Sequence, residues 1–174
     1  MKDYSVVRSD EVFKGKILDV IWDVVRMPGG GEALREVVRH GAAAAVLPVV
    51  DGKIILVRQY RHPIKGFALE IPAGMTETGE DPKDCAAREL EEETGYKCAD
   101  LTFLFKMYSS IGFCTELLHV YLAENLTTGV QNLDPDEFVT VEAYDVERAT
   151  DMIFSGEIVD SKTIAAILAY RFKR

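Results

Sequence analysis

The chain has 174 residues, of which 48% are hydrophobic, and its formal net charge is −9 at pH 7. This length favours one domain, or one domain with a small appendage, and the apolar content is sufficient for a buried core. The acidic balance argues against a nucleic-acid backbone as partner, because such binding relies on clustered Lys and Arg. It does not exclude a small nucleotide held by metal and a few arginines.

The N-terminal sequence lacks the apolar run of a signal peptide, and no apolar stretch is long enough to span a membrane. The three cysteines, Cys85, Cys98 and Cys114, are odd in number and irregularly spaced. This usage predicts reduced thiols in a cytoplasmic protein, and no grouping of Cys and His has the spacing of a zinc site.

In chain order, residues 12–27 and 32–40 are predicted to form strands on either side of the glycine-rich turn at residues 28–31. We therefore expect a short N-terminal β segment, residues 1–40, ahead of a main domain that spans residues 41–174. The alternation of apolar and polar side chains in this segment is the period expected of strands.

The main domain opens with a nearly continuous apolar run at residues 42–50, which is typical of a strand buried on both faces. Asp51 and Gly52 then give a two-residue hairpin signal before a return strand at residues 53–60. A further short strand is predicted at residues 67–71, just before Pro72.

A helix is predicted over residues 82–94, because Asp81 can cap its first turn and Gly95 can end it. The remaining predicted elements are strands at residues 101–109, 117–124 and 138–144 and helices at residues 146–154 and 161–172. Four apolar residues of the last helix recur at helical spacing and are expected to contact the core: Ile164, Ile167, Leu168 and Phe172. This order predicts an α/β fold in which helices flank a mixed sheet.

Four carboxylates lie within five residues near the end of the helix predicted over residues 82–94: Glu89, Glu91, Glu92 and Glu93. Glu89, Glu92 and Glu93 share one helix face, where like charges cost roughly 0.2–0.5 kcal/mol per pair. The helix dipole disfavours anions at this end by about 0.3–1 kcal/mol more. Arg88 relieves part of this repulsion, and a hard divalent cation would relieve more, since it prefers carboxylate oxygens. Glu91 lies off this face and is expected to be solvated.

The spacing of Gly74, Glu80, Arg88-Glu89-Leu90, Glu92-Glu93 and Gly95-Tyr96 is similar to the Nudix box, although Tyr96 is aromatic where an aliphatic residue is usual. The resemblance implies a Nudix hydrolase, which cleaves a nucleoside diphosphate linked to another group, and a Nudix-type α/β/α sandwich. Outside the box, four sequences resemble the ADP-ribose pyrophosphatase branch: residues 57–61, 69–74, 136–139 and 160–163. The resemblance covers roughly residues 40–171.

The branch implies magnesium-dependent hydrolysis of ADP-ribose, or of a related ADP-sugar, to AMP and ribose 5-phosphate, with Mn²⁺ as an alternative to Mg²⁺. It also implies a homodimer in which residues 1–40 reach the partner's site. The expected binding partners are therefore a nucleotide sugar and a second copy of the chain, with no nucleic acid and no membrane.

By the same resemblance, Glu89, Glu93 and the carbonyl of Ala73 are the principal metal ligands. Glu92 is expected to be a further ligand, directly or through water, and Arg88 to orient the glutamates by charge-assisted hydrogen bonds. Both are therefore also predicted to support catalysis. Glu70 is a candidate for the metal site or its surroundings; the alternative is that it merely pairs with a lysine.

The resemblance also implies contacts with substrate. Arg61 matches a substrate-contacting arginine of the branch, and Arg39 matches another. Met75 and Gly112 fall where the branch places residues against the ligand. Arg58 is a further candidate for the diphosphate, or simply a solvent-facing charge.

The general base is expected on the acidic loop that follows the box, where Glu137 aligns best and Asp136 is an alternative. Glu116 is a second alternative, because it follows a loop expected to face the site. That loop departs from the branch: Ser110-Ile111-Gly112 replaces the usual Ser-Pro-Gly. The alternatives are therefore hydrolysis of another nucleoside diphosphate sugar, a dinucleotide or an oxidised nucleotide, and a regulator that binds ADP-ribose without cutting it.

Overall fold

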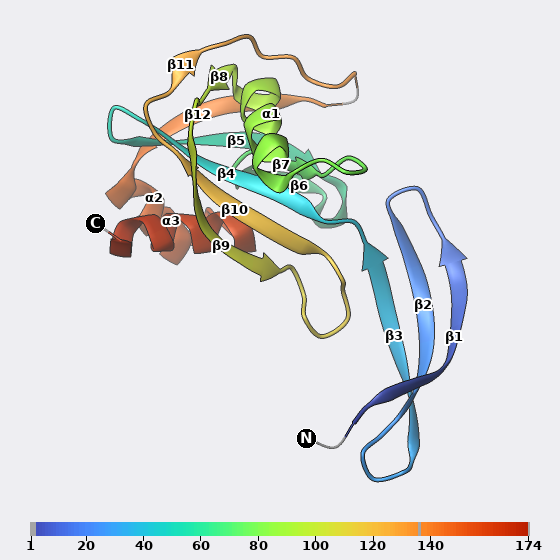
Figure 1. Cartoon of the computed structure of the whole chain (residues 1–174). Helices are drawn as coiled ribbons and strands as arrows, with labels where there is room; N and C mark the ends of the chain where they lie inside the picture. The colour runs from blue at the N-terminus through green and yellow to red at the C-terminus, as the bar shows by residue number, and fades with distance from the viewer. Residues whose placement is uncertain (1–2, 136, 174) are drawn as a thin grey trace. The chain divides into compact units, whose positions relative to one another are not determined.

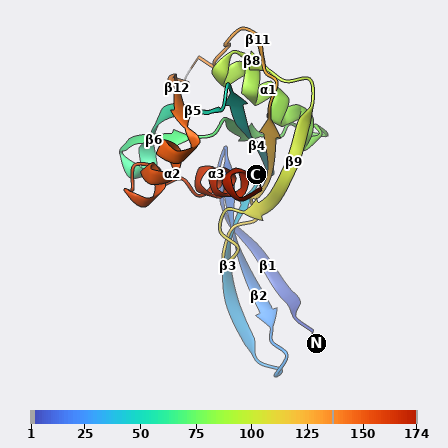
Figure 2. The ribbon, with the colours of Figure 1, turned by 90° about the vertical axis from the view of Figure 1, so that its left-hand side faces the viewer.

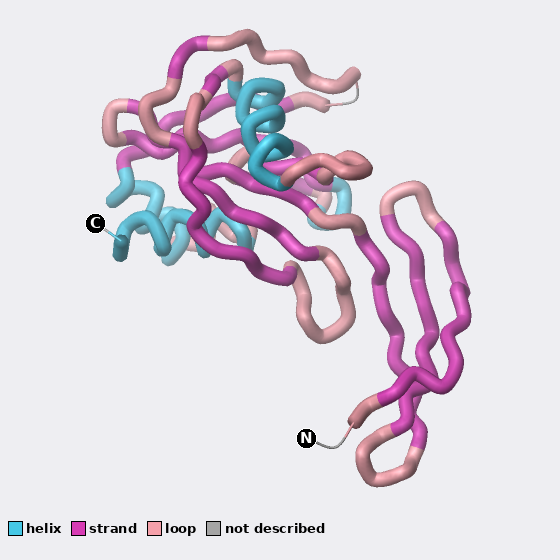
Figure 3. Tube along the Cα trace, viewed as in Figure 1, coloured by secondary structure: helices cyan, strands magenta, loops and turns pink. Residues whose placement is uncertain are grey.

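The computed structural model of the protein describes residues 3–135 and 137–173. The chain divides into two compact units. The first takes in the chain up to Ala42 together with Tyr108–Leu117, and the second takes in Ala43–Met107 and the chain from Leu118 onward. Figure 1 gives the order of the elements, and Figure 3 marks them as helix, strand or loop.

The first unit is a three-stranded antiparallel sheet in the order β1-β2-β3, formed by β1 (Ser5–Lys14), β2 (Leu18–Arg26) and β3 (Glu32–His40). The segment from Tyr108 to Leu117 joins this sheet through main-chain bonds on both sides of Val38. The Val38 nitrogen donates to the Phe113 carbonyl at 2.7 Å, and the Thr115 nitrogen donates to the Val38 carbonyl at 3.0 Å.

The prediction of a single strand over residues 12–27 is wrong, because a turn at residues 15–17 separates β1 from β2. The nitrogen of Gly15 donates to the carbonyl of Leu18 at 3.0 Å and closes this turn. A Cβ atom on Gly15 would lie 2.6 Å from that same carbonyl oxygen. The turn therefore depends on a residue without a side chain, and the strand pattern of the flanking residues conceals it.

The second unit is built on a seven-stranded mixed sheet in the order β12-β5-β4-β10-β9, in which β6 also pairs with β5 and β7 with β4. The strands are β4 (Ala43–Val50), β5 (Lys53–Arg61), β6 (Gly66–Glu70), β7 (Ala73–Met75), β9 (Leu101–Tyr108), β10 (Leu117–Ala123) and β12 (Val139–Asp145). Pairing is parallel between β4 and β10 and antiparallel between β4 and β5. A separate two-stranded sheet joins β8 (Tyr96–Lys97) to β11 (Thr127–Thr128).

In the described part of the chain, three α-helices cover the sheet of the second unit: α1 (Pro82–Thr94), α2 (Val146–Phe154) and α3 (Ser161–Lys173). Helix α1 lies over one face, and α2 and α3 lie over the other (Figures 1 and 2). A 3-10 turn, η1 (His62–Ile64), follows β5. The predicted α/β fold with a mixed sheet flanked by helices is confirmed. None of the described helices is long and apolar enough to cross a membrane.

Strand β4 supplies the core on both faces of the sheet. Ala45 and Leu47 belong to the apolar cluster that includes α2 and α3, whereas Ala44 and Val46 belong to the cluster that includes α1. Successive side chains of a strand point to opposite faces, so a strand covered by helices on both sides must be apolar at every position. This is why the run predicted at residues 42–50 is continuous rather than alternating.

The predicted stripe of core residues in α3 needs a correction at Phe172, which is 80% exposed. The buried residues of this helix are Thr163, Ala166, Ile167 and Tyr170. Phe172 lies five residues after Ile167, which places it roughly 140° around the helix and outside the buried face. Ile164 packs at the edge of the core.

A split in the sheet positions the next segment of the chain. The β4–β5 hairpin turns at Asp51 and Gly52, whose φ values of 49° and 78° suit a tight hairpin turn. Strands β4 and β5 pair only next to this turn; farther along, β5 pairs with β6 and β4 pairs with β7. The link between β6 and β7 therefore passes from one strand to the other, and β7 comes to lie beside α1.

Candidate active site

The centre of the site is the contact between β7 and α1. Ala73, Gly74 and Met75 pair with Ala45, Ala44 and Ala43 of β4. Helix α1 begins at Pro82, after the Asp81 side chain accepts a hydrogen bond from the nitrogen of Lys83, and ends at Gly95 with a φ of 71°. These are the cap and the end that the sequence predicts.

Gly74 lies directly against the carboxylate of Glu89. A Cβ atom on Gly74 would lie 2.0 Å from Oε1 of Glu89 and 2.7 Å from its Oε2. Real Cβ atoms essentially never come within 3.0 Å of another heavy atom. The absence of a side chain at Gly74 is therefore what allows this carboxylate to sit against the main chain of β7.

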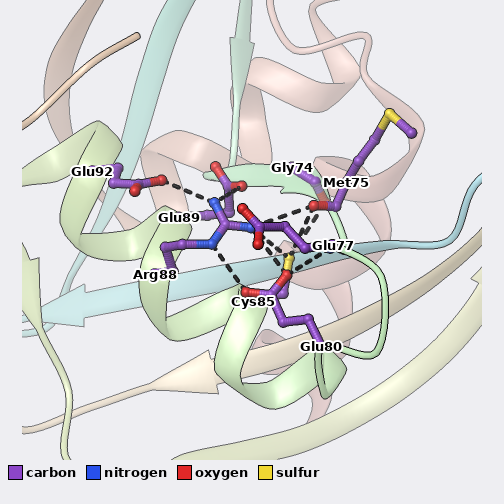
Figure 4. A network of polar contacts seen from close by, with 8 residues as sticks. All are labelled: Gly74, Met75, Glu77, Glu80, Cys85, Arg88, Glu89 and Glu92. Carbon is purple, nitrogen blue, oxygen red and sulfur yellow. Dashed lines mark hydrogen bonds and ion pairs between the residues drawn. The ribbon is translucent and has the colours of Figure 1, made fainter. Parts of the chain in front are cut away.

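Arg88 connects three of the glutamates (Figure 4). Its Nη1 donates to Glu89 at 2.6 Å and to Glu92 at 2.9 Å, and its Nε and Nη2 donate to the two oxygens of Glu80 at 3.0 and 3.1 Å. The Nη2 group also approaches the carbonyl of Met75 at 3.3 Å. One guanidinium thus offsets part of the repulsion among the carboxylates and ties α1 to the loop before it.

Glu80 closes that loop. Its side chain accepts a hydrogen bond from the nitrogen of Glu77 at 2.8 Å, and its own nitrogen donates to the Glu77 carbonyl at 3.1 Å. Bonds from Arg88 and from the Glu77 main chain lower the pKa of Glu80 to about 2. Glu80 is therefore charged at neutral pH and holds both the loop and the arginine.

Glu93 is the most buried carboxylate of α1, with 3% of the residue exposed. Burial first, and then the charges of Glu89 and Glu137, raise the pKa of Glu93 to about 8, although the main-chain N–H of Ala73 opposes this rise. Among the described residues, Oε2 of Glu93 is buried without a hydrogen-bond partner. Burial also raises the pKa of Glu89. Two crowded, desolvated carboxylates favour a nearby positive charge, and Arg88, which pairs with Glu89, divides its charge among Glu80, Glu89 and Glu92.

The fourth glutamate of the cluster, Glu91, has a partner outside the helix. Glu91 pairs with Lys97 at 2.9 Å, so it is an ion-pair partner rather than a free, solvated group. Within the described residues, no three Asp, Glu, His or Cys side chains converge closely enough to hold a metal ion. The predicted ligands Glu89, Glu92 and Glu93 thus share one region without surrounding one point.

Glu70, at the end of β6, accepts hydrogen bonds on both oxygens. Arg61 donates from Nε to Oε1 at 2.6 Å and from Nη2 to Oε2 at 2.8 Å, and Nζ of Lys162 donates to Oε2 at 2.5 Å. Burial alone would raise the pKa of Glu70, but these two cations outweigh it and lower the pKa to about 2. Lys162 was not among the predicted site residues, although residues 160–163 carried part of the family resemblance.

A cavity of about 390 Å³ opens beside this pair of cations. Arg61, Glu70, Asp160 and Lys162 supply its charged groups, and its apolar wall consists of Pro63, Ile64, Ala68 and Val159. The neighbouring arginine of β5, Arg58, is instead paired with Glu142 at 2.5 Å.

The segment that leads to Glu137 is fastened to the end of α1. The side chain of Gln131 donates to the carbonyl of Glu93 at 2.7 Å, and the nitrogen of Asn132 donates to the carbonyl of Glu92 at 3.0 Å. These bonds satisfy carbonyl groups that a helix end leaves free. Glu137 itself is near enough to raise the pKa of both Glu89 and Glu93. Gln131 lacked any signal in the sequence, and the alternative base Asp136 lies outside the described residues.

Three other predicted residues belong to the first unit. The guanidinium of Arg39, on β3, is held by Asp19 of the neighbouring strand β2 at 2.8 Å and by Glu11 of β1 at 2.6 Å. Gly112 lies in the loop from Ser110 to Cys114, where a Cβ atom would meet open space. Glu116 lies 3.5 Å from Nδ1 of His40.

Comparison with known proteins identifies the family. The model of the NUDIX domain matches residues 39–167. The chain is 44% identical over 172 residues to a protein of Bacillus subtilis (strain 168) named ADP-ribose pyrophosphatase, covering 97% of this chain and 93% of that protein. It is 40% identical over 166 residues to the methanol dehydrogenase activator of Bacillus methanolicus, covering 94% and 90%.

A solved structure described as an ADP compounds hydrolase superposes with a TM-score of 0.90. It covers 98% of this chain and 94% of that chain at 21% sequence identity, so it speaks for the fold alone. Both the predicted sandwich and the predicted Nudix hydrolase are confirmed. On this match of sequence and fold, the chain belongs to the family of NUDIX domain proteins.

Proposed function

We propose that this protein hydrolyses the diphosphate bond of ADP-ribose, or of a related ADP-sugar, to give AMP and ribose 5-phosphate with the help of Mg²⁺. The observation that carries the proposal is the buried Oε2 of Glu93, which lacks a hydrogen-bond partner among the described residues. It belongs to a helix face that also carries Glu89 and Glu92. Oxygen-rich, negatively charged and partly desolvated, this donor set suits a hard divalent cation.

In this proposal Glu89, Glu93 and the carbonyl of Ala73 hold the metal, and Glu92 supports it directly or through water. Gly74 leaves the space that the Glu89 carboxylate occupies. A divalent ion bound there would supply Lewis acidity and charge neutralisation at the diphosphate. Since Arg88 already neutralises part of the charge on Glu89 and Glu92, its hydrogen bonds to them would have to loosen as the metal binds.

The remaining roles follow from position. Arg61 would bind the diphosphate, because its side chain is 42% exposed beside the cavity. Met75, half-exposed on β7, would contact the nucleotide. Glu137 would take the proton from the attacking water, since it lies near Glu89 and Glu93 and its segment is fastened to α1. Arg39 and Gly112, which belong to the first unit, would keep the substrate-binding role that the family resemblance implies.

Sequence similarity supports the choice of substrate. The Bacillus subtilis relative named ADP-ribose pyrophosphatase matches nearly the whole chain. The departure at Ile111 favours testing a wider range of substrates, because that loop has lost the proline expected in this branch. A nucleotide-sugar panel is therefore part of the test.

The test is release of AMP from ADP-ribose by the purified protein, measured by chromatography with and without Mg²⁺. Glu93→Gln should lose nearly all activity, whereas Glu91→Gln, whose charge is paired with Lys97, should keep it. A wild-type protein that is inactive with Mg²⁺, or a fully active Glu93→Gln variant, would refute the proposal. Tight ADP-ribose binding without hydrolysis would favour a regulator, and preference for another nucleotide would replace the substrate.

We also propose that residues 1–40 form a dimerisation and substrate element. The first unit exposes several large apolar side chains in its described residues, including Tyr4, Val6, Phe13, Ile17 and Trp22. Scattered apolar residues are normal on a surface, but this many in one small unit need a covering surface. Deleting residues 1–40 should give a monomer with a raised KM, as measured by light scattering and steady-state kinetics. A truncated protein that remains a fully active dimer would rule this out.

A further inference from the structure

The pair formed by Arg61 and Glu70 is held in place from α3. Glu70 accepts two hydrogen bonds from Arg61, at 2.6 and 2.8 Å, in the side-by-side geometry that fixes a guanidinium plane. The side chain of Glu70 is only 5% exposed. With Arg61 as its only partner, the Glu70 carboxylate could still rotate together with the guanidinium. A second donor in a fixed position would hold both groups in one orientation.

Lys162 is that second donor. Its side chain is 12% exposed, and its Nζ lies 2.5 Å from Oε2 of Glu70 and 3.1 Å from Oδ2 of Asp160. The same Asp160 oxygen accepts from the nitrogen and the hydroxyl of Thr163, at 3.0 and 2.6 Å. Asp160, the residue before α3, therefore bonds both the first turn of the helix and the ammonium group of Lys162.

A third link connects this turn to the main chain next to Glu70. The hydroxyl of Thr163 accepts a hydrogen bond from the nitrogen of Ile71 at 2.8 Å, and Thr163 is fully buried. Both ends of the connection are thus anchored: α3 holds the backbone after Glu70 and, through Lys162, the Glu70 carboxylate. Buried networks whose members are all satisfied hold their groups in one geometry.

The Nη1 group of Arg61 is available to bind a ligand. Its Nε and Nη2 are engaged by Glu70, and among the described residues no hydrogen bond is made by its Nη1. The side chain is 42% exposed and lines the cavity of about 390 Å³. A guanidinium fixed along one edge and free at the other is suited to binding a phosphate oxygen.

We propose that Lys162 is a positioning residue for substrate binding: by holding Glu70 it fixes the guanidinium of Arg61 for the diphosphate. This inference rests on the proposed function, in which Arg61 binds the substrate's phosphates. Lys162 acts on binding rather than on the chemical step, because within the described residues its ion pairs are with Glu70 and Asp160 and none is with a glutamate of the box.

The experiment compares KM and kcat for ADP-ribose in the wild type and in Lys162→Met, Lys162→Arg, Arg61→Ala and the double variant of Arg61→Ala with Lys162→Met. Lys162→Met should raise KM about tenfold, equivalent to about 1.4 kcal/mol of binding, with kcat within about twofold. Lys162→Arg should recover most of the loss, because it keeps a donor for Glu70. The double variant should match Arg61→Ala, since Lys162 acts through Arg61.

The matched control is Lys83→Met. Lys83 is also the second residue of a helix and also pairs with an aspartate, Asp100, at 2.8 Å. Its loss should leave KM and kcat unchanged. Thermal unfolding of every variant shows whether an effect comes from loss of the fold; if Lys162→Met fails to fold, Lys162→Gln takes its place.

Direct binding of ADP and of adenosine separates this inference from the proposed function. Lys162→Met should weaken binding of ADP but not of adenosine, which lacks phosphates. Failure of the wild type to hydrolyse ADP-ribose would overturn the proposed function, and the ADP measurement would still decide the role of Lys162. Wild-type KM in Lys162→Met, a loss confined to kcat, equal weakening of both ligands, or additivity in the double variant would each overturn the inference.

Discussion

Replacing Gly74 with alanine tests the geometry of the site most directly. The added Cβ atom would lie 2.0 Å from Oε1 of Glu89, whereas ordinary contacts begin near 3.4 Å. The main chain at Gly74 is fixed by pairing with Ala44 of β4, so the carboxylate rather than the strand must move. We expect Oε1 to shift by about 1.4 Å and its 2.6 Å bond with Arg88 to break.

The expected loss of activity is much larger than the loss of stability. A displacement of about 1 Å in a reacting group can reduce the rate roughly 100-fold. Crowding of a core position costs about 1–3 kcal/mol, and the lower end applies because the far end of a flexible side chain is what moves. For a chain of this length, about 1 kcal/mol corresponds to a fall in Tm of roughly 2–4 °C.

The assay measures kcat for AMP release together with thermal unfolding. Gly66→Ala is the control, because a Cβ atom there would meet only the Ile64 carbonyl, at 3.7 Å. It should retain both activity and Tm. A Gly74→Ala protein with kcat within about twofold of the wild type would refute the reasoning, since Glu89 would then not need its present place. A Gly74→Ala protein that fails to fold would show that the strand yields instead.

Three further predictions concern the surroundings of the site. Burial raises the pKa of the Cys85 thiol to about 12 and leaves it without exposed surface, so at pH 8 only two of the three cysteines should react quickly with a thiol reagent until the protein is unfolded. The pKa of Glu80 is lowered to about 2 from 4.5, so its stabilising contribution is complete above pH 4.5 and disappears as the pH falls toward 2. Glu80→Gln should flatten that decline in urea unfolding, and an unchanged slope would contradict it. Gln131→Ala should lose about 1 kcal/mol of stability and lower kcat, because it frees the segment bound to the Glu93 carbonyl. Asn132→Ala, which keeps its main-chain bond, should do neither, and equal effects of the two substitutions would argue against the contact.

The parts of this structure that the sequence predicts are those fixed by neighbours in the chain. Helix α1 begins and ends where expected because Asp81, Pro82 and Gly95 carry its limits locally. The continuous apolar run of β4 likewise reveals a strand covered on both sides. By contrast, β7 has three residues and becomes a strand only because β4 offers it a partner.

Contacts across long stretches of chain explain what sequence reasoning missed at the site. Glu70 and Lys162 are 92 residues apart, so nothing near either residue announces their pairing. Local patterns allow a lysine partner for Glu70 but do not identify it as Lys162. Gln131 reaches Glu93 over 38 residues and is an ordinary loop glutamine until the fold brings them together.

The parallel pairing of β4 with β10 has a consequence for the order in which the protein folds. Ala43 lies opposite Leu118, and that register continues to Pro48 and Ala123, so the central strand finds this neighbour only after most of the chain has been synthesised. Closing so long a loop is slow, because its entropy must be lost before the contacts form. Since β7 and α1 both rest on β4, the glutamates should acquire their final places late, and refolding should restore helical content before enzymatic activity.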